Sequence, residues 1–410
     1  NYILELRLRQ LTKYSRIELE AERDKLRQEI AELERILGSD SALRELVSDE
    51  LAEVAEKYGN DRRTVLKTKD DMQSAIEAVS NGASKAKKSL GLALEIADEP
   101  CWVLLTASGI LGRTVGKPMR EALVDPGKRI KHDVFTSIVP TTARGEIGAV
   151  TSMGRMVRLS VMDLVVFDDS SGTPVLTTGV KATEVVALAK GEKLVGIVPL
   201  NEVLALATAN GVIKRVNPEY PLNQTEWDVI KLKPKDTVIA ATVCSSDDNA
   251  LTLVTQEAKL LTFDAAKVRP QGRAGGGIAG IKLGAQDAVI ALGVIAPGSA
   301  AEVVTVTNGQ DGMASAKVTP LAEYPQKGRA TGGVRAHRFL TGESKLALAW
   351  VGVGPAKAGT PGGVARSLPT EHGSRDGSGV PLTQAIGAVG PNYAAITEQA
   401  KMASDGEKLF

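Results

Sequence analysis

The 410-residue chain is poor in aromatic residues, cysteine and histidine, and its positive and negative charges almost cancel. Aromatic residues make up 3% of the chain, which argues against a stacking surface for single-stranded nucleic acid. Because the formal net charge is only +1, any basic surface must be local. Cys101 and Cys244 lie far apart and are expected to be buried thiols in a reducing compartment. No hydrophobic run is long enough to cross a membrane and no signal sequence is visible, so we expect a cytoplasmic protein without a membrane partner.

No group of residues in the sequence resembles an assembled active site. His132, His337 and His372 are far apart and have no neighbouring ligand at metal-binding spacing. The segment 275–280 matches G-x-G-x-x-G, but a strand-like alternation follows it where a dinucleotide site needs a helix. We therefore predict no catalytic residue, no metal site and no cofactor in this chain, and we reject an independent enzyme.

Residues 1–66 are predicted to be helical. Leu19, Leu26, Ile30, Leu33 and Leu37 follow alternating three- and four-residue steps, as in the apolar seam of a coiled coil, and a second helix is expected at about 42–57. Periodicity leaves two interpretations open: a helical hairpin packed on itself, or an arm whose seam needs a partner helix. Residues 67–90 are small, polar and basic, and are expected to form a linker.

From about residue 91 the hydrophobic period changes to two, and a unit begins to recur. Its first half is an apolar strand, a tight turn and a second strand with basic residues, as in 203–216, where Asn210-Gly211 predicts a type I′ hairpin turn. Its second half ends in another apolar strand. The first halves cover 102–114, 147–159, 203–216, 251–263 and 302–317; the closing strands are expected at 195–200, 238–243, 289–295 and 346–351, with a sixth, degenerate copy at 346–389.

Repeats of this kind, each worth about four strands, are typical of a radial array. A single repeat cannot bury its apolar face alone, whereas several repeats stacked around an axis can. The sequence therefore predicts a mostly β protein, a six-bladed propeller-like array over residues 91–395, preceded by the helical arm and followed by a tail at 396–410.

Cations recur at or just after the hairpin turns and in the second half of each repeat. In a radial array equivalent positions fall on one rim, so these residues would form a basic belt that suits the regular phosphates of duplex DNA. The alternative is that surface strands carry Lys and Arg only to prevent edge-to-edge pairing. The predicted DNA-binding residues are Arg113, Lys128, Arg129, Lys131, Arg155, Arg158, Lys214, Arg215, Lys259, Arg269, Arg273, Lys327, Arg329, Arg335 and Arg338.

Several stretches resemble one known family. Residues 3–12 (ILELRLRQLT) and 56–64 (EKYGNDRRT) are similar to the end of the breakage–reunion core and the returning coiled-coil arm of type IIA DNA topoisomerase A subunits. Residues 268–283 (VRPQGRAGGGIAGIKL) and 324–337 (YPQKGRATGGVRAH) are similar to blades of their C-terminal domain. The resemblance implies a β-pinwheel that binds and bends duplex DNA but lacks the catalytic tyrosine. The chain begins at Asn1 without an initiator methionine, so we expect it to be part of a longer protein.

The gyrase members of this family carry a box, Q-[RK]-R-G-G-[RK]-G, in their first blade. In this sequence the corresponding segment 125–133 (DPGKRIKHD) does not match, and the nearest approach is a degenerate box in a later blade, formed by Gln271, Gly272, Arg273, Ala274, Gly275, Gly276 and Gly277. This departure favours a topoisomerase IV A subunit, which relaxes and decatenates DNA, over a DNA gyrase A subunit.

The resemblance also implies partners. The intact, nucleoid-associated enzyme would contain a B subunit that uses ATP and Mg²⁺ together with a second copy of the A subunit, and the segment 1–66 could self-associate. An alternative of another class is a propeller-like protein-interaction module on a coiled-coil stalk, which would ignore DNA.

Overall fold

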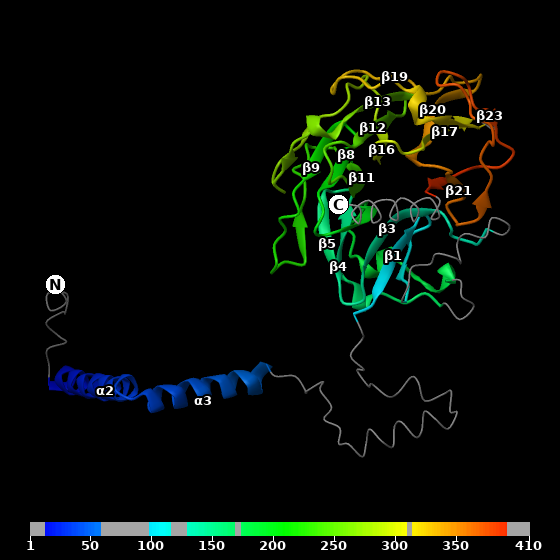
Figure 1. Cartoon of the computed structure of the whole chain (residues 1–410). Helices are drawn as coiled ribbons and strands as arrows, with labels where there is room; N and C mark the ends of the chain where they lie inside the picture. Colours follow the sequence, from blue (N-terminus) through cyan, green and yellow to red (C-terminus); the bar gives the residue numbers. More distant parts are fainter. Residues whose placement is uncertain (1–12, 59–97, 116–128, 169–173, 310–313, 392–410) are drawn as a thin grey trace, which may run out of the picture. The chain divides into compact units, whose positions relative to one another are not determined.

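The computed structural model describes residues 13–58, 98–115, 129–168, 174–309 and 314–391, which form two compact units divided between Leu92 and Ala93 (Figure 1). The predicted linker 67–90, the tail 396–410 and Lys128 lie outside the described residues. Within the described part, no helix is long and apolar enough to cross a membrane.

The first unit contains two helices, α2 (Lys13–Leu37) and α3 (Asp40–Tyr58). α2 ends at Leu37, and the N–H of Gly38 donates the last helical bond to the carbonyl of Glu34. Leu26, Ile30 and Leu33 remain 52%, 53% and 55% exposed, and the apolar residues of α3 are exposed as well. The described helices are therefore not a hairpin packed on itself; pairing of their seam with another helix stays a prediction.

The second unit is a mostly β, six-bladed pinwheel, as predicted (Figure 1). The blades follow the order of the hairpins in the sequence, and the strands of each blade are named from the inner strand outward. Blade 1 contains β3 (Phe135–Thr142), β1 (Pro100–Thr106), β2 (Ile110–Arg113) and β6 (Val180–Lys181); blade 2 contains β7 (Leu194–Pro199), β4 (Glu146–Thr151), β5 (Arg155–Ser160) and β10 (Glu226–Asp228).

The other blades repeat this order. Blade 3 contains β11 (Val238–Val243), β8 (Leu204–Thr208), β9 (Val212–Val216), β14 (Pro270–Gln271) and β15 (Ile278–Ala279); blade 4 contains β16 (Val289–Ile295), β12 (Ala250–Thr255), β13 (Lys259–Asp264) and β19 (Val334–Arg335); blade 5 contains β20 (Glu343–Val353), β17 (Ala301–Gly309), β18 (Ser315–Pro320) and β23 (Val380–Pro381); blade 6 contains β24 (Ala388–Gly390), β21 (Lys357–Gly359) and β22 (Ala365–Arg366).

Blades 1 to 5 each receive their outer strand from the next repeat of the sequence, an arrangement that the sequence did not reveal. After the β8–β9 hairpin of blade 3, the chain returns to blade 2 as β10 and then supplies β11, the inner strand of blade 3. The same path recurs for β6, β14–β15, β19 and β23. A repeat is therefore not a blade: 346–351 belongs to blade 5, and blade 6 begins only at β21.

The hairpin turns share a threonine and a left-handed residue three positions later. The N–H of Gly211 donates to the carbonyl of Thr208, and the threonine hydroxyl accepts the N–H of Val212. Positive φ occurs at Gly211 but not at Asn210, so the predicted type I′ turn is wrong, and the geometry fits a turn followed by a left-handed glycine. Equivalent turns begin at Thr106, Thr151, Thr255 and Thr360.

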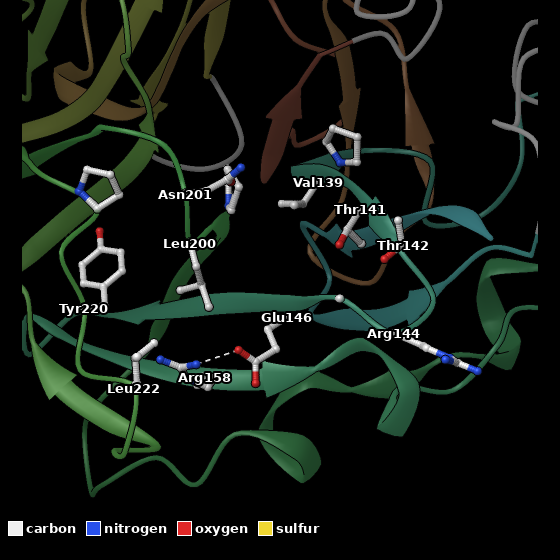
Figure 2. Close-up of a pocket in the computed structure, with 14 residues that line it drawn as sticks. Val139, Thr141, Thr142, Arg144, Glu146, Arg158, Leu200, Asn201, Tyr220 and Leu222 are labelled. Carbon is white, nitrogen blue, oxygen red and sulfur yellow. Dashed lines mark hydrogen bonds and ion pairs between the residues drawn. The ribbon is translucent and has the colours of Figure 1, made fainter. Parts of the chain in front are cut away.

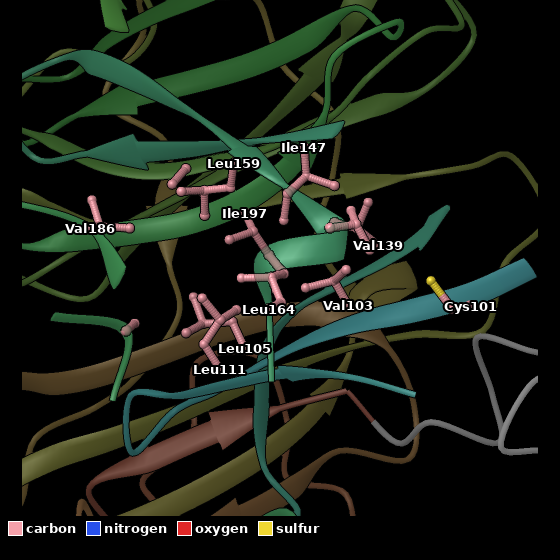
Figure 3. Packing of buried hydrophobic residues seen from close by; sticks show 13 residues of the cluster. Cys101, Val103, Leu105, Leu111, Val139, Ile147, Leu159, Leu164, Val186 and Ile197 are labelled. Atoms are coloured by element: carbon pink, nitrogen blue, oxygen red, sulfur yellow. The ribbon is translucent and has the colours of Figure 1, made fainter. Parts of the chain in front are cut away.

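The apolar core lies between adjacent blades. Between blades 1 and 2, Val103, Leu111 and Ile147 are completely buried and pack with Ile197 (Figure 3). Similar clusters join each following pair of blades. Because each blade contributes one face to each neighbouring cluster, the inner strands are held in place and the outer strands and their loops remain at the rim.

Candidate nucleic-acid interface

The predicted cations separate into an interior group and a surface group. Arg113, Lys214 and Arg215 are at most 8% exposed, and Arg129, Arg155 and Arg158 are held in internal bonds. Lys259 and Arg329 are half-buried. The exposed residues are Lys131, Arg269, Arg273, Lys327, Arg335 and Arg338.

Lys214 is a fully buried ammonium in β9. Its Nζ donates to the carbonyls of Val229 at 2.7 Å, Arg273 at 2.9 Å and Gly275 at 2.7 Å. Three acceptors match the three protons of an ammonium. Burial lowers the pKa of Lys214 to about 8. In this structure the side chain anchors the loop 271–277 and is shielded from solvent.

Arg215, the next residue, is also internal. Its guanidinium donates to the carbonyls of Cys244, Ala265 and Val268 and pairs with Asp247 at 2.5 Å. The side chain therefore joins the ends of loops in blades 3 and 4.

Blade 2 contains two further internal arginines. Arg155 donates to both carboxylate oxygens of Glu192 at 2.8 Å, and this pairing lowers the pKa of the Glu192 carboxyl to about 2. Arg158 pairs with Glu146 at 2.6 Å and lies over the ring of Trp227, 5.2 Å from its centroid. Both guanidinium groups therefore pair with carboxylates of the protein itself, although the Nε of Arg158 is buried without a hydrogen-bond partner among the described residues.

Arg129 joins the first blade to the last. It binds both oxygens of buried Asp133 at 2.8 Å and donates to the carbonyls of Arg366 at 2.7 Å and Ala358 at 2.8 Å. The N–H of His132 adds a bond to the carbonyl of Gly363. This segment lies next to blade 6 and closes the ring.

Of the exposed cations that the sequence predicts to bind DNA, all except Lys131 lie on the outer strands and loops of blades 3 and 4. Arg269 and Arg273 flank β14, while Lys327, Arg335 and Arg338 flank or belong to β19. Lys259 and Arg335 lie directly opposite each other on β13 and β19, and among the described residues neither has an acidic partner. Opposed like charges destabilise a sheet unless an anion lies between them.

A separate hollow of about 650 Å³ opens where blades 1 and 2 meet the loop after β9 (Figure 2). It is lined by the Arg158–Glu146 pair, Tyr220, which stacks on Trp227, and Leu222, which is 86% exposed. The Tyr220 hydroxyl is buried without a hydrogen-bond partner among the described residues. The hollow is wide, mostly apolar and without converging catalytic groups.

Sequence reasoning missed Lys317, Glu323 and Arg375. Lys317 is the counterpart of Lys214 in blade 5, and its Nζ donates to the carbonyls of Ser374 at 2.9 Å, Arg375 at 2.8 Å and Gly377 at 3.0 Å. Both lysines lie at the same place in their hairpins, and each is followed about 60 residues later by a glycine-rich loop. That spacing is the signal that could have identified the pair.

Comparison with known proteins agrees with this architecture. Residues 250–296 and 314–343 match the family model "DNA gyrase C-terminal domain, beta-propeller". The chain is 28% identical over 346 residues to the A subunit of DNA gyrase from Mycobacterium bovis, covering 81% of this chain and 38% of that protein. It is 26% identical over 347 residues to the same protein from Staphylococcus epidermidis, covering 81% and 36%. Over most of its length the chain is therefore similar to the C-terminal part of the type IIA topoisomerase A subunits.

Two solved structures share the fold of the pinwheel. The C-terminal domain of DNA topoisomerase IV aligns with a TM-score of 0.58 at 18% identity, covering 76% of this chain and 99% of that one. A DNA gyrase A C-terminal domain aligns with a TM-score of 0.50 at 16% identity, covering 71% and 99%. The chain spans less than two fifths of the length of the curated A subunits that it matches. These similarities do not distinguish topoisomerase IV from gyrase.

Proposed function

We propose that the pinwheel is the duplex-DNA-binding and DNA-bending domain of a type IIA topoisomerase. The observation that carries the proposal is the Lys259–Arg335 pair, two opposed cations on the outer strands of blade 4 without an acidic partner among the described residues. A phosphate between them would relieve their repulsion. The exposed cations beside β14 and β19 extend this positive edge from blade 4 to blade 3.

The interior cations support the proposal in another way. Lys214, Arg215 and Arg155 form hydrogen bonds inside the blades. These bonds stabilise the outer strands and loops to which the exposed cations belong. We assign phosphate contact to Lys131, Lys259, Arg269, Arg273, Lys327, Arg329, Arg335 and Arg338, and a supporting role to Arg113, Arg129, Arg155, Arg158, Lys214 and Arg215.

Within the family we favour a topoisomerase IV-type protein. In the segment 125–133, Lys128-Arg129 fits two positions of the gyrase box, but the glutamine before them and the Gly-Gly after them are missing, which argues against chiral wrapping. The gyrase assignment fits the family match and the curated relatives equally well. In the intact cytoplasmic enzyme, a B subunit that binds ATP and Mg²⁺ and a second copy of the A subunit would complete strand passage.

Fluorescence anisotropy with a labelled duplex, measured over a series of salt concentrations, tests DNA binding. Engagement of ~6–10 phosphates would lower the affinity by about three to five powers of ten between 50 and 200 mM salt, with little dependence on sequence. Charge reversal at Lys259 and Arg335 should reduce this dependence while thermal unfolding stays unchanged. A protein-interaction module would show no duplex binding at low salt.

Topoisomer analysis separates the topoisomerase IV type from the gyrase type. A nicked plasmid is religated with the protein bound, and its linking number is measured. An unchanged linking number is expected for a topoisomerase IV-type domain that bends DNA without chiral wrapping, whereas a shift would favour the gyrase alternative.

A further inference from the structure

The inner strands of the six blades surround a hollow of about 530 Å³ on the axis of the pinwheel. β3, β7, β11, β16, β20 and β24, one strand from each blade, contribute residues to its wall. None of the described residues that line this axial hollow carries a charge, although 24% of the residues of the chain are charged. A charged occupant would lose its hydration there without gaining a partner, so the hollow requires an uncharged one.

The wall of the axial hollow presents large apolar side chains. Ile239, Leu292, Leu348 and Trp350 line it from three different blades, and each of them is only partly buried. Their remaining exposure follows from the fold, because the apolar clusters between the blades cover the other faces of the same strands. An occupant that covers these side chains from water would stabilise the pinwheel.

The wall also presents polar backbone groups. Each inner strand is the last strand of its described sheet, so one of its edges has no neighbouring strand. At one position the protein supplies a partner itself, because the N–H of Ile197 in β7 donates to the hydroxyl of Ser137 in β3, 3.1 Å away. An occupant that offers backbone donors and acceptors as well as apolar side chains therefore fits this wall better than a hydrocarbon does, and a peptide segment offers both.

The chain itself leads to this wall. Pro391, the last of the described residues, lines the axial hollow, and Gly390 before it lies so close to β3 that a Cβ atom would meet the carbonyl oxygen of Phe135. Residues 392–397 (NYAAIT) follow directly and carry no charge at neutral pH. Six residues reach roughly 20 Å when extended, whereas a wall of five residues such as 239–243 measures roughly 17 Å. The uncharged segment is therefore long enough to cross the hollow.

We propose that residues 392–397 bind inside the axial hollow of their own pinwheel, where Tyr393 and Ile396 cover the apolar wall. The attachment at Pro391 makes this binding intramolecular, so the segment is present at a high effective concentration that a free ligand or a second copy of the chain does not have. Binding holds β24, an inner strand of only three residues, against the inner strands of the other blades. This site is independent of the proposed DNA binding.

The fluorescence of Trp350 tests whether the hollow is filled. In the full chain with Trp102→Phe and Trp227→Phe it is the only tryptophan, and acrylamide quenching measures its contact with water. Tyr393→Glu with Ile396→Glu places two charges in the segment, which an uncharged hollow rejects. We expect this double variant to increase the quenching of Trp350 and, in the chain with all three tryptophans, to lower the Tm by about 2–4 °C.

Leu409→Glu is the matched control, since it adds a charge to an apolar residue outside the segment, and it should change neither quenching nor Tm. A synthetic peptide of residues 392–410 added to the double variant should restore the protection of Trp350. Equal quenching in the wild-type chain and the double variant would overturn the proposal, whether the hollow is open or holds an apolar ligand. An equal effect of Leu409→Glu would overturn it as well. Protection that grows with protein concentration would assign the hollow to the segment of a second copy and exclude intramolecular binding.

Discussion

The backbone N–H of Gly379 donates a hydrogen bond to Nε2 of His337, with the two nitrogens 3.2 Å apart. Nε2 must therefore carry a lone pair, which places the ring proton on Nδ1, 2.8 Å from the hydroxyl of Thr305. His337 is 2% exposed and fixes the end of the loop 373–379 in its neutral form. Protonation would break the bond to Gly379.

We expect the pinwheel to lose stability when the solution is acidified through the titration range of His337. Burial, assisted by the nearby Lys317 ammonium, lowers the pKa of His337 from 6.5 to about 4, while Glu343 acts in the opposite direction. Between these values the unfolded chain binds the extra proton, so the free energy of unfolding falls as the pH falls from 6.5 towards 4, by up to about 3 kcal/mol. Urea unfolding measured from neutral pH down to about 4 gives this slope.

The matched variant is His337→Gln, which keeps polar atoms but does not titrate. It should flatten most of the slope between pH 6.5 and about 5, leaving the smaller contribution of His132, whose pKa burial also lowers. Below about pH 5 the lowered pKa of Glu192 adds a separate loss of stability that this variant retains. A variant with the wild-type slope would show that other groups are responsible.

A second prediction concerns the pair Arg155–Glu192. The Glu192 carboxylate is fully buried, and Arg155 neutralises it through two bonds. Arg155→Met would leave a buried charge without its partner, which should cost about 3–5 kcal/mol of unfolding free energy. Chemical denaturation measures this loss. Lys131→Met, at an exposed cation of the neighbouring blade, should change stability by less than about 0.5 kcal/mol. Similar stabilities of the two variants would contradict the structural role of Arg155.

Lys214 and Arg273 show how far the sequence could predict the candidate site. Lys214 and Arg273 are equally polar in the sequence, and only the fold distinguishes them. One of the carbonyls that bind the Lys214 ammonium belongs to Gly275, 61 residues away in the chain. Gly275 lies between β14 and β15, which follow the hairpin of blade 4 in the chain but pair with β9 of blade 3. Local pattern thus predicts that cations recur but cannot tell which of them face solvent.

The strands themselves were more predictable. The segments 203–216 and 251–263 form hairpins as expected, because apolar alternation and a turn residue act over short distances. The exchanged outer strands were missed because strands as short as Val334–Arg335 contain too few residues to show a period. Their position depends on pairing with the preceding blade, which is a tertiary effect.

A third prediction concerns closure of the ring at Arg129. Its guanidinium binds buried Asp133 and two carbonyls of blade 6, and only Lys357 at 3.8 Å would remain beside Asp133 in its absence. Arg129→Ala should increase hydrogen exchange in β21 and β24 while β12 and β13 of blade 4 stay protected. Uniform exchange across both blades would indicate global destabilisation and contradict a local closing role.

The fourth prediction concerns the exposed apolar seam of α2. Leu26 and Ile30 lie one helical turn apart, and both are about half exposed although their side chains are fully apolar. Such a stripe is stabilised when it packs against a second helix, and in a solution of this chain alone the available helix is that of another copy. We therefore expect concentration-dependent association in sedimentation velocity, which Leu26→Glu with Ile30→Glu should abolish. Lys25→Glu, which alters the charge of an exposed polar position, should leave association intact. A wild-type chain that stays monomeric at high concentration would show that the seam does not drive self-association.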